Sequence, residues 1–297
     1  MRKVYNVRYG VQKIKTTADN FKAMAALAIT GLAAAIALPI ATHAASSSVI
    51  VTPTNTQGWS TADTRPGGAV NFVNDSTAPG NPNLGALQLT TDATTAAKAQ
   101  YMHAANTALS SVSELSYYTK QNSASFPGGD ASYQLVVCLN GAPTATDCPG
   151  FTTLVYEPYQ GGQGAVVPGT WQQWNIGTTG LFWSSKSVTC SNGPVTGSAG
   201  GPSIYTISDI QALCPSAVVA GFGVNVGTYN PSYDVETDLV DFNGTTYNFE
   251  PYQVATDKDA CKNGGWMTQT DVNGNSFKNQ GACVSYVASG GQSDHQH

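Results

Sequence analysis

The sequence predicts a mainly β protein, an antiparallel β-sandwich with one short capped helix and a small, disulfide-stapled helical hairpin near its C-terminus. Short runs rich in β-branched and aromatic residues alternate with Gly, Pro, Asn and Ser turns between residues 47 and 253. Asn243-Gly244 joins two such runs, and this dipeptide is a strong hairpin signal because both residues tolerate positive φ. Helical patterns are rare over the same region, which favours a sandwich over alternating β and α units.

The run at residues 218–226, VVAGFGVNV, is apolar throughout and is expected at the centre of the sandwich, where a strand is covered on both faces. Gly221 and Gly223 mark places where a facing layer can approach. The other predicted strands lie at residues 49–52, 69–73, 86–90, 98–102, 114–119, 133–139, 151–158 and 170–176, and in the hairpin of residues 237–250.

One helix is predicted inside the sandwich region. Thr206 is a suitable N-cap, and Asp209 follows three residues later as in a capping box. The segment ISDIQALC follows, and Pro215 ends the turn. We expect this helix to lie over one end of the sandwich and to lead into the strand at residues 218–226.

Residues 1–44 have the pattern of a signal peptide. A basic segment precedes an apolar core at residues 24–40, and Thr42 and Ala44 form the small-x-small pattern of a cleavage site. We therefore expect secretion, with cleavage after Ala44 and no membrane contact afterwards. The alternative is an uncleaved N-terminal anchor, but the core is shorter and richer in Ala than the ~20 strongly apolar residues that a span prefers.

Cleavage would make the protein strongly acidic. Six of the 13 basic residues and one of the 18 acidic residues lie within residues 1–44, so the formal net charge would change from −5 to −10. A surface of this charge repels phosphate backbones, which argues against a nucleic-acid partner.

Six cysteines follow the signal segment and indicate disulfides formed in an oxidising compartment. Fifteen connectivities are possible, but pairing in sequence order closes loops of only 10 to 24 residues. A zinc site is a poor alternative, because the chain has no Cys-x-x-Cys and His103 is the only histidine between the signal segment and the tail. The expected pairs are Cys138–Cys148, Cys190–Cys214 and Cys261–Cys283.

The remaining chain is expected to have three parts. They are the sandwich at residues 45–253, the disulfide-stapled helical hairpin at residues 254–288 and a disordered tail at residues 289–297. In the hairpin, Thr256 can cap a first short helix that Gly264 ends, and Ser276 can cap a second helix. Two short helices packed over Trp266 make a unit too small to hold without its disulfide.

Asp234, Glu236 and Asp238 fall on every second residue, which places three carboxylates on one face of a strand. The pattern resembles the catalytic strand of the laminarinase and lichenase group of β-glucanases, which carries Glu-x-Asp-x-Glu on one face. That resemblance implies a nucleophile and an acid/base at the outer two positions, which are aspartates here. Two other interpretations are a structural calcium site, since hard cations bind several carboxylate oxygens, and a solvated polar face of an edge strand.

The aromatic-rich segment at residues 156–183 is the second candidate site. Trp171 and Trp174 face opposite sides in strand register, so one is expected in the core and the other outside. An exposed Trp beside Gln and Asn can serve as a platform for a sugar ring, although large aromatics also fill cores. The expected ligand-binding residues are Trp174, Trp183, Tyr156, Tyr159 and Glu157. Serine or cysteine nucleophiles are not expected, because no histidine partner is available.

Residues 50–252 resemble the jelly-roll sandwiches of secreted carbohydrate-binding modules and the wider lectin-like group. The closing segment YDVETDLVDFNGTTYNFE and the Trp/Tyr-rich centre carry this resemblance. It implies a jelly-roll fold and a glycan or another cell-surface ligand. The segments YEPYQ, TWQQWN, FWSSKS, AGFGVNVG and DACKNGGW…FKNQGACVSYV also resemble a recurring type of bacterial secreted protein, which implies compartment and fold but no chemistry.

The leading hypothesis is therefore a secreted module that binds a glycan or another cell-surface ligand through one face of the sandwich without catalysis, with structural calcium as its one candidate cofactor. The second hypothesis is a jelly-roll glycoside hydrolase that uses Glu157 or the acid row, the name used below for Asp234, Glu236 and Asp238. The third is a structural or adhesive surface protein.

Overall fold

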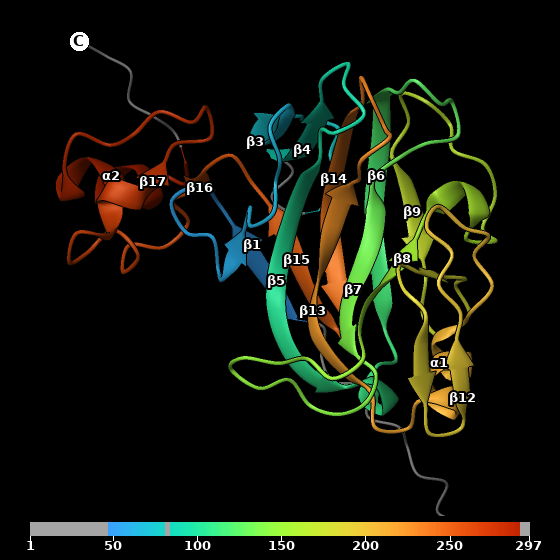
Figure 1. Ribbon diagram of the computed structural model, residues 1–297. Helices are drawn as coiled ribbons and strands as arrows, with labels where there is room; N and C mark the ends of the chain where they lie inside the picture. Colours follow the sequence, from blue (N-terminus) through green and yellow to red (C-terminus); the bar gives the residue numbers. More distant parts are fainter. Residues whose placement is uncertain (1–46, 81–83, 292–297) are drawn as a thin grey trace, which may run out of the picture. The chain divides into compact units, whose positions relative to one another are not determined.

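The computed structural model describes residues 47–80 and 84–291, and two β-sheets packed face to face dominate this part of the chain (Figure 1). In sheet 1, β14 pairs with β6 along one edge and with both β4 and β15 along the other. The mainly β, jelly-roll-like sandwich that the sequence predicts is confirmed. The strands of sheet 1 are β1 (Ser47–Val51), β3 (Gly68–Asn74), β4 (Gly85–Thr91), β6 (Leu115–Ser123), β9 (Gln172–Asn175), β14 (Asp234–Phe242) and β15 (Thr245–Phe249).

Sheet 2 has β13 (Val218–Val226) between β5 and β7, so the apolar run at residues 218–226 is central as predicted. The backbone packs closely here, because a Cβ added at Gly223 would lie 2.2 Å from the carbonyl oxygen of Tyr101 in β5. The other strands of sheet 2 are β2 (Trp59–Ser60), β5 (Ala99–Ala108), β7 (Ser132–Cys138), β8 (Phe151–Tyr156) and β10 (Trp183–Ser184).

Alternation of residue type along the strands builds one core between the two sheets. In β7, Tyr133, Leu135 and Val137 are fully buried, and the residues between them face away from sheet 1. Phe222 of β13 stacks on Phe242 of β14 with ring centroids 4.3 Å apart, which joins the two sheets directly. The antiparallel prediction holds for most pairs, and β1 is an exception because it runs parallel to β15.

The predicted Asn-Gly hairpin joins β14 to β15. Asn243 and Gly244 have φ values of 54° and 79°, the positive values that a type I′ turn requires. The Gly244 N–H donates to Asp241 Oδ1 over 3.2 Å, so the strand before the turn also holds the turn in place.

The predicted capped helix is α1 (Ile207–Leu213). Thr206 Oγ1 accepts from the backbone N–H of Asp209, and the Asp209 carboxylate accepts from the backbone N–H of Thr206, which completes the capping box. A disulfide between Cys190 and Cys214 joins the end of α1 to the two-stranded sheet formed by β11 (Val188–Cys190) and β12 (Gly193–Val195). Cys138–Cys148 and Cys261–Cys283 are also bonded, so the three predicted pairs are confirmed.

The C-terminal region has its own small core around Ala255, Cys261, Cys283 and Tyr286. Its second predicted helix exists as α2 (Gln280–Ala288), but Asn279 rather than Ser276 is the N-cap. The first predicted helix is wrong, because residues 258–264 form turns in which Asp257 Oδ1 accepts from the Asp259 N–H. Such local side-chain bonds compete with a helix. The remaining elements are η1 (Leu109–Ser111), η2 (Pro158–Gln160), η3 (Gly265–Thr268), β16 (Gln253–Val254) and β17 (Gln269–Thr270).

The predicted signal peptide and most of the predicted tail lie outside the described residues. Within the part of the chain that the structure describes, no helix combines the length and the apolar character needed to cross a membrane.

Candidate ligand-binding cleft

A cleft of about 600 Å³ lies over the face of sheet 2 that points away from the core. Strand register explains its floor, because Trp183, Val155 and Gln134 pair across β10, β8 and β7 and therefore point to the same side. Ser132 and Thr153 add hydroxyl groups to this face. The floor therefore combines amide and hydroxyl groups with apolar side chains, whereas the opposite face of the same strands is the apolar core.

Aromatic rings form one wall of the cleft. Tyr159 of η2 is 41% exposed and Phe126 is 49% exposed, and their ring centroids lie 5.2 Å apart in an edge-to-face arrangement. Trp183 adds a half-buried ring from the edge strand β10. Exposed rings that are held by one another present a firm apolar surface at little entropic cost on binding.

Glu157 and Gln160 fix the orientation of this wall. Pro158 starts η2 immediately after β8, which turns the chain so that both Glu157 and Tyr159 reach the cleft. Glu157 Oε2 accepts from Trp183 Nε1 over 2.9 Å and from Gln160 Nε2. Gln160 Nε2 also donates to Tyr159 Oη over 3.0 Å, so one amide connects the carboxylate with the phenol.

Tyr229, on the loop between β13 and β14, lies across the cleft and was not predicted from the sequence. Its side chain is 81% exposed, and its φ of 67° is unusual for a bulky residue. The Tyr229 N–H donates to the Thr95 carbonyl oxygen over 2.8 Å, which anchors this loop. The available signal was an aromatic residue within the turn sequence GTYNPS, since turns lie on the surface.

Two basic side chains, Arg65 and Lys98, line one end of the cleft. Both are partly neutralised by Asp63, which lies 2.5 Å from Lys98 Nζ and 3.7 Å from Arg65 Nε. The hydrogen bond from Lys98 is the main reason that the pKa of Asp63 lies below its usual value. This end of the cleft therefore carries little unbalanced positive charge.

Asp130 is the most deeply buried carboxyl group of the cleft. Its oxygens accept from Thr119 Oγ1 over 2.6 Å and from the Ala131 N–H over 2.8 Å. Burial raises the pKa of Asp130 to about 7, because loss of hydration outweighs these two hydrogen bonds.

Trp183, Tyr159 and Glu157 lie together in the cleft, but Trp174 and Tyr156 do not. Trp174 is 2% exposed, and its Nε1 donates to Thr119 Oγ1 over 2.8 Å. Tyr156 is fully buried and faces the core from β8. The prediction that these two rings contact a ligand is therefore wrong. Trp171 is the partly exposed partner of Trp174, which confirms that the two indoles face opposite sides.

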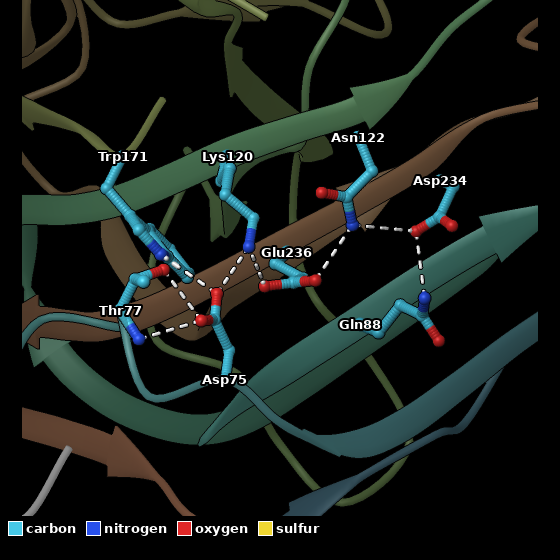
Figure 2. A network of polar contacts seen from close by, with 8 residues as sticks. All are labelled: Asp75, Thr77, Gln88, Lys120, Asn122, Trp171, Asp234 and Glu236. Carbon is cyan, nitrogen blue, oxygen red and sulfur yellow. Dashed lines mark hydrogen bonds and ion pairs between the residues drawn. The ribbon is translucent and has the colours of Figure 1, made fainter. Parts of the chain in front are cut away.

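Figure 2 shows the surroundings of Asp234 and Glu236, the first two residues of the acid row, in β14 of sheet 1. Glu236 forms an ion pair of 2.8 Å with Lys120, and Asn122 Nδ2 donates to both Glu236 and Asp234. Gln88 Nε2 donates to Asp234 over 2.9 Å. These two acids thus belong to a polar network with hydrogen-bond donors already in place.

Asp75, on the loop after β3, completes this network (Figure 2). It pairs with Lys120 and accepts from Trp171 Nε1 over 3.2 Å and from Thr77. Burial raises the pKa of Asp75, but the bonds from Lys120 and Thr77 outweigh it and hold that pKa well below the usual value. A cation in the middle of the network makes it a structural support rather than a metal site.

Asp238 is separated from its two neighbours in the acid row. It is fully buried, and its Oδ1 accepts from the Phe249 N–H over 2.8 Å. A polysaccharide therefore has no access to it in this structure, which removes the pair of outer acids that the β-glucanase resemblance implies. Among residues 47–80 and 84–291, no group of three or more His, Cys, Asp or Glu side chains is arranged to hold a metal ion, so the three acids do not form the expected calcium site.

No family model and no curated protein matches the chain. Among solved structures, it is similar to a family 11 carbohydrate-binding module from Clostridium thermocellum in complex with a β-1,3-1,4-mixed-linked tetrasaccharide. The two sequences are 12% identical, and the alignment covers 64% of this chain and 91% of that chain with a TM-score of 0.36. It is also similar to the family 11 carbohydrate-binding module of the cellulosomal cellulase Lic26A-Cel5E of Clostridium thermocellum. Here the identity is 11%, and the alignment covers 65% of this chain and 89% of that chain with a TM-score of 0.35.

An arabinose-bound MgGH51 α-L-arabinofuranosidase is similar at 8% identity over 65% of this chain and 24% of that chain, with a TM-score of 0.36. Similarities at these TM-scores do not identify a function for this chain.

Proposed function

We propose that this protein is a non-catalytic glycan-binding module and that the cleft over sheet 2 holds the glycan. The observation that supports this proposal is the combination of exposed rings, Tyr159, Phe126 and Tyr229, with amide and hydroxyl groups on the floor. Sugar rings present apolar C–H faces that pack on aromatic rings, and their hydroxyls exchange hydrogen bonds with amides and carboxylates. A cleft that offers both kinds of contact has the chemistry that a glycan needs.

The charge of the cleft favours a neutral glycan. Asp63 lies beside both Arg65 and Lys98, and Glu157 adds a negative charge close to the aromatic wall. An anionic sugar would find no unpaired cation among these residues, whereas the hydroxyls of a neutral sugar can donate to Glu157.

A glycan array followed by calorimetric titration of the best polysaccharide tests this proposal. Tyr159→Ala and Trp183→Ala should each weaken binding by about tenfold or more, because burying one aromatic ring is worth about 1.5–3 kcal/mol and 1.4 kcal/mol corresponds to a factor of ten. Tyr229→Asn should also weaken binding while it retains a residue that tolerates positive φ. The matched control is Phe151→Ala, which removes a 42% exposed ring that does not line the cleft.

The proposal fails if no neutral or acidic polysaccharide binds, or if Phe151→Ala weakens binding as much as the cleft variants do. The first outcome would favour a structural or adhesive surface protein.

A glycoside hydrolase is the second candidate, because the cleft contains two carboxyl groups, Glu157 and Asp130, and Asp130 has a pKa of about 7. Release of reducing sugar by the wild-type protein, abolished in Glu157→Gln, would support this candidate. Binding without any release would favour the module.

The three disulfides are typical of proteins that fold in an oxidising environment. We infer that the protein is secreted and that residues 1–44 are removed. Intact-mass analysis of the exported protein tests this, since a mass that matches the full chain would contradict cleavage.

A further inference from the structure

Two carboxylates that the proposed function does not use are buried together on the outward face of sheet 1. Asp238 lies in β14, and its Oδ1 accepts from the backbone N–H of Phe249. Phe249 points into the core, so its sequence neighbours Asn248 and Glu250 point to the opposite side, where Asp238 also lies. Asp238, Asn248 and Glu250 are all 0% exposed.

Backbone N–H groups bond to both carboxylates, the Asn248 side chain also bonds to Glu250, and one oxygen of each carboxylate still has no partner. Glu250 Oε2 accepts from the Leu84 N–H over 3.0 Å, as Asp238 Oδ1 accepts from Phe249. No described residue donates a hydrogen bond to Asp238 Oδ2 or to Glu250 Oε1, and both atoms are buried. Buried polar atoms are nearly always paired, so two unpaired oxygens in one place require an explanation.

Negative charge at this position is also unbalanced. None of the ion pairs among the described residues includes Asp238 or Glu250, and Lys120, the cation of the same face, is held by Asp75 and Glu236. The backbone N–H groups of Phe249 and Leu84 bond to these two carboxylates, and such bonds stabilise the ionised form.

We propose that Asp238 and Glu250, with Asn248 beside them, form a binding site for one calcium ion. The donor set consists of two carboxylates and an amide, and hard cations prefer such oxygen ligands. Calcium suits the place better than magnesium, because calcium accepts irregular geometry and bidentate carboxylates, whereas magnesium demands a near-ideal octahedron. The backbone amides of Phe249 and Leu84 would orient the two carboxylates, as partners outside the ligand set do in metal sites.

This site differs from the one that the acid row suggested. It retains Asp238 but has Asn248 and Glu250 in place of Asp234 and Glu236. Asn248 lies in β15, the second strand of the hairpin, and Glu250 is the residue that follows this strand. A shared proton is the competing way to neutralise the pair, and the experiment separates the two.

The full-length protein is depleted with EDTA, dialysed and titrated with calcium by calorimetry and by thermal unfolding. We expect one calcium ion per chain and a rise in Tm of about 5–10 °C at a calcium concentration one hundred times the Kd. Asp238→Asn and Glu250→Gln should each remove the calcium-dependent shift. Asp234→Asn is the matched control, because this acid belongs to the separate network with Gln88 and Asn122, and it should leave the shift unchanged.

The wild-type titration does not depend on whether a variant folds. If the depleted wild-type protein binds no calcium at millimolar concentration and its Tm does not change, the proposal is overturned and a shared proton explains the pair. An intact calcium shift in Glu250→Gln, or its loss in Asp234→Asn alone, would also overturn it. Glycan affinity is measured at the other sheet, so failure here leaves the proposed function untouched.

Discussion

Trp183 Nε1 donates a hydrogen bond to Glu157 Oε2 over 2.9 Å, which joins the edge strand β10 to the residue that follows β8. Both side chains line the cleft, so this contact holds an aromatic ring and a carboxylate at a fixed separation. A preformed arrangement of this kind reduces the entropy lost when a ligand binds.

Trp183→Phe keeps an aromatic ring but removes this donor, and we expect it to lower the free energy of unfolding by about 1–2 kcal/mol. In a Glu157→Gln background the same substitution should have a smaller effect, because the charged acceptor is already absent. Urea denaturation of the four proteins in this double-mutant cycle measures the coupling. Strictly additive effects would show that the contact does not contribute.

Lys120→Met should destabilise the sandwich by about 3 kcal/mol, because it leaves Asp75 and Glu236 without their shared cation in a poorly hydrated place. The same substitution combined with Asp75→Asn and Glu236→Gln should recover most of the loss. Chemical denaturation provides the measurement. Lys262→Met is the control, since Lys262 is 54% exposed and water screens its ion pair with Asp259, so that this pair contributes little to stability. Equal losses for the two lysine variants would contradict this account.

Asp130 should make the protein less stable as the pH rises from about 4 to about 7. Its pKa is raised from 3.8 to about 7 in the folded state, so between these values the folded chain keeps a proton that the unfolded chain has lost. The stabilisation is complete below the unfolded pKa and disappears as the pH passes the folded pKa. Glu250 contributes in the same direction, so the relevant quantity is the difference between the wild type and Asp130→Asn.

The stability of Asp130→Asn should therefore change less over this pH range than that of the wild type, as measured by urea denaturation at several pH values. Parallel stability curves would show that Asp130 does not titrate in this way.

Replacing Cys261 and Cys283 by Ser should open the C-terminal region while the sandwich stays folded. The small core there contains Ala255 and Tyr286 besides the disulfide, and loss of a disulfide typically removes about 2–4 kcal/mol. Hydrogen exchange should show faster exchange for the amides of α2 and unchanged exchange in β13. Protection of α2 at the wild-type level would mean that packing alone holds this region together.

Much of the fold could be predicted because its signals are local. The capping box needs only Thr206 and Asp209, and the hairpin needs only Asn243 and Gly244 between two β-rich runs. The C-terminal region shows the limit of such signals. Thr256 and Gly264 suggested a first helix, but Asp257 bonds to the nearby backbone and residues 258–264 form turns instead.

The candidate site was predicted only in part, because exposure depends on which segment covers a residue. Trp174 and Trp183 both lie in the same aromatic-rich segment, yet one indole is buried against Thr119 and the other lines the cleft. Strand alternation showed that Trp171 and Trp174 face opposite sides, but it could not show which side would be covered.

The sequence by itself determined the class of the fold, the longer strands, the helix cap and the disulfide pairs, since these depend on residues close to one another along the chain. Only the tertiary structure decided what the acids do. Lys120 and Asp75, 45 residues apart, meet at Glu236, and Asp238 is buried against Phe249 beside Glu250. The charge and hydration of a carboxylate are set by the groups around it in space, so three acids with the same spacing acquired different roles.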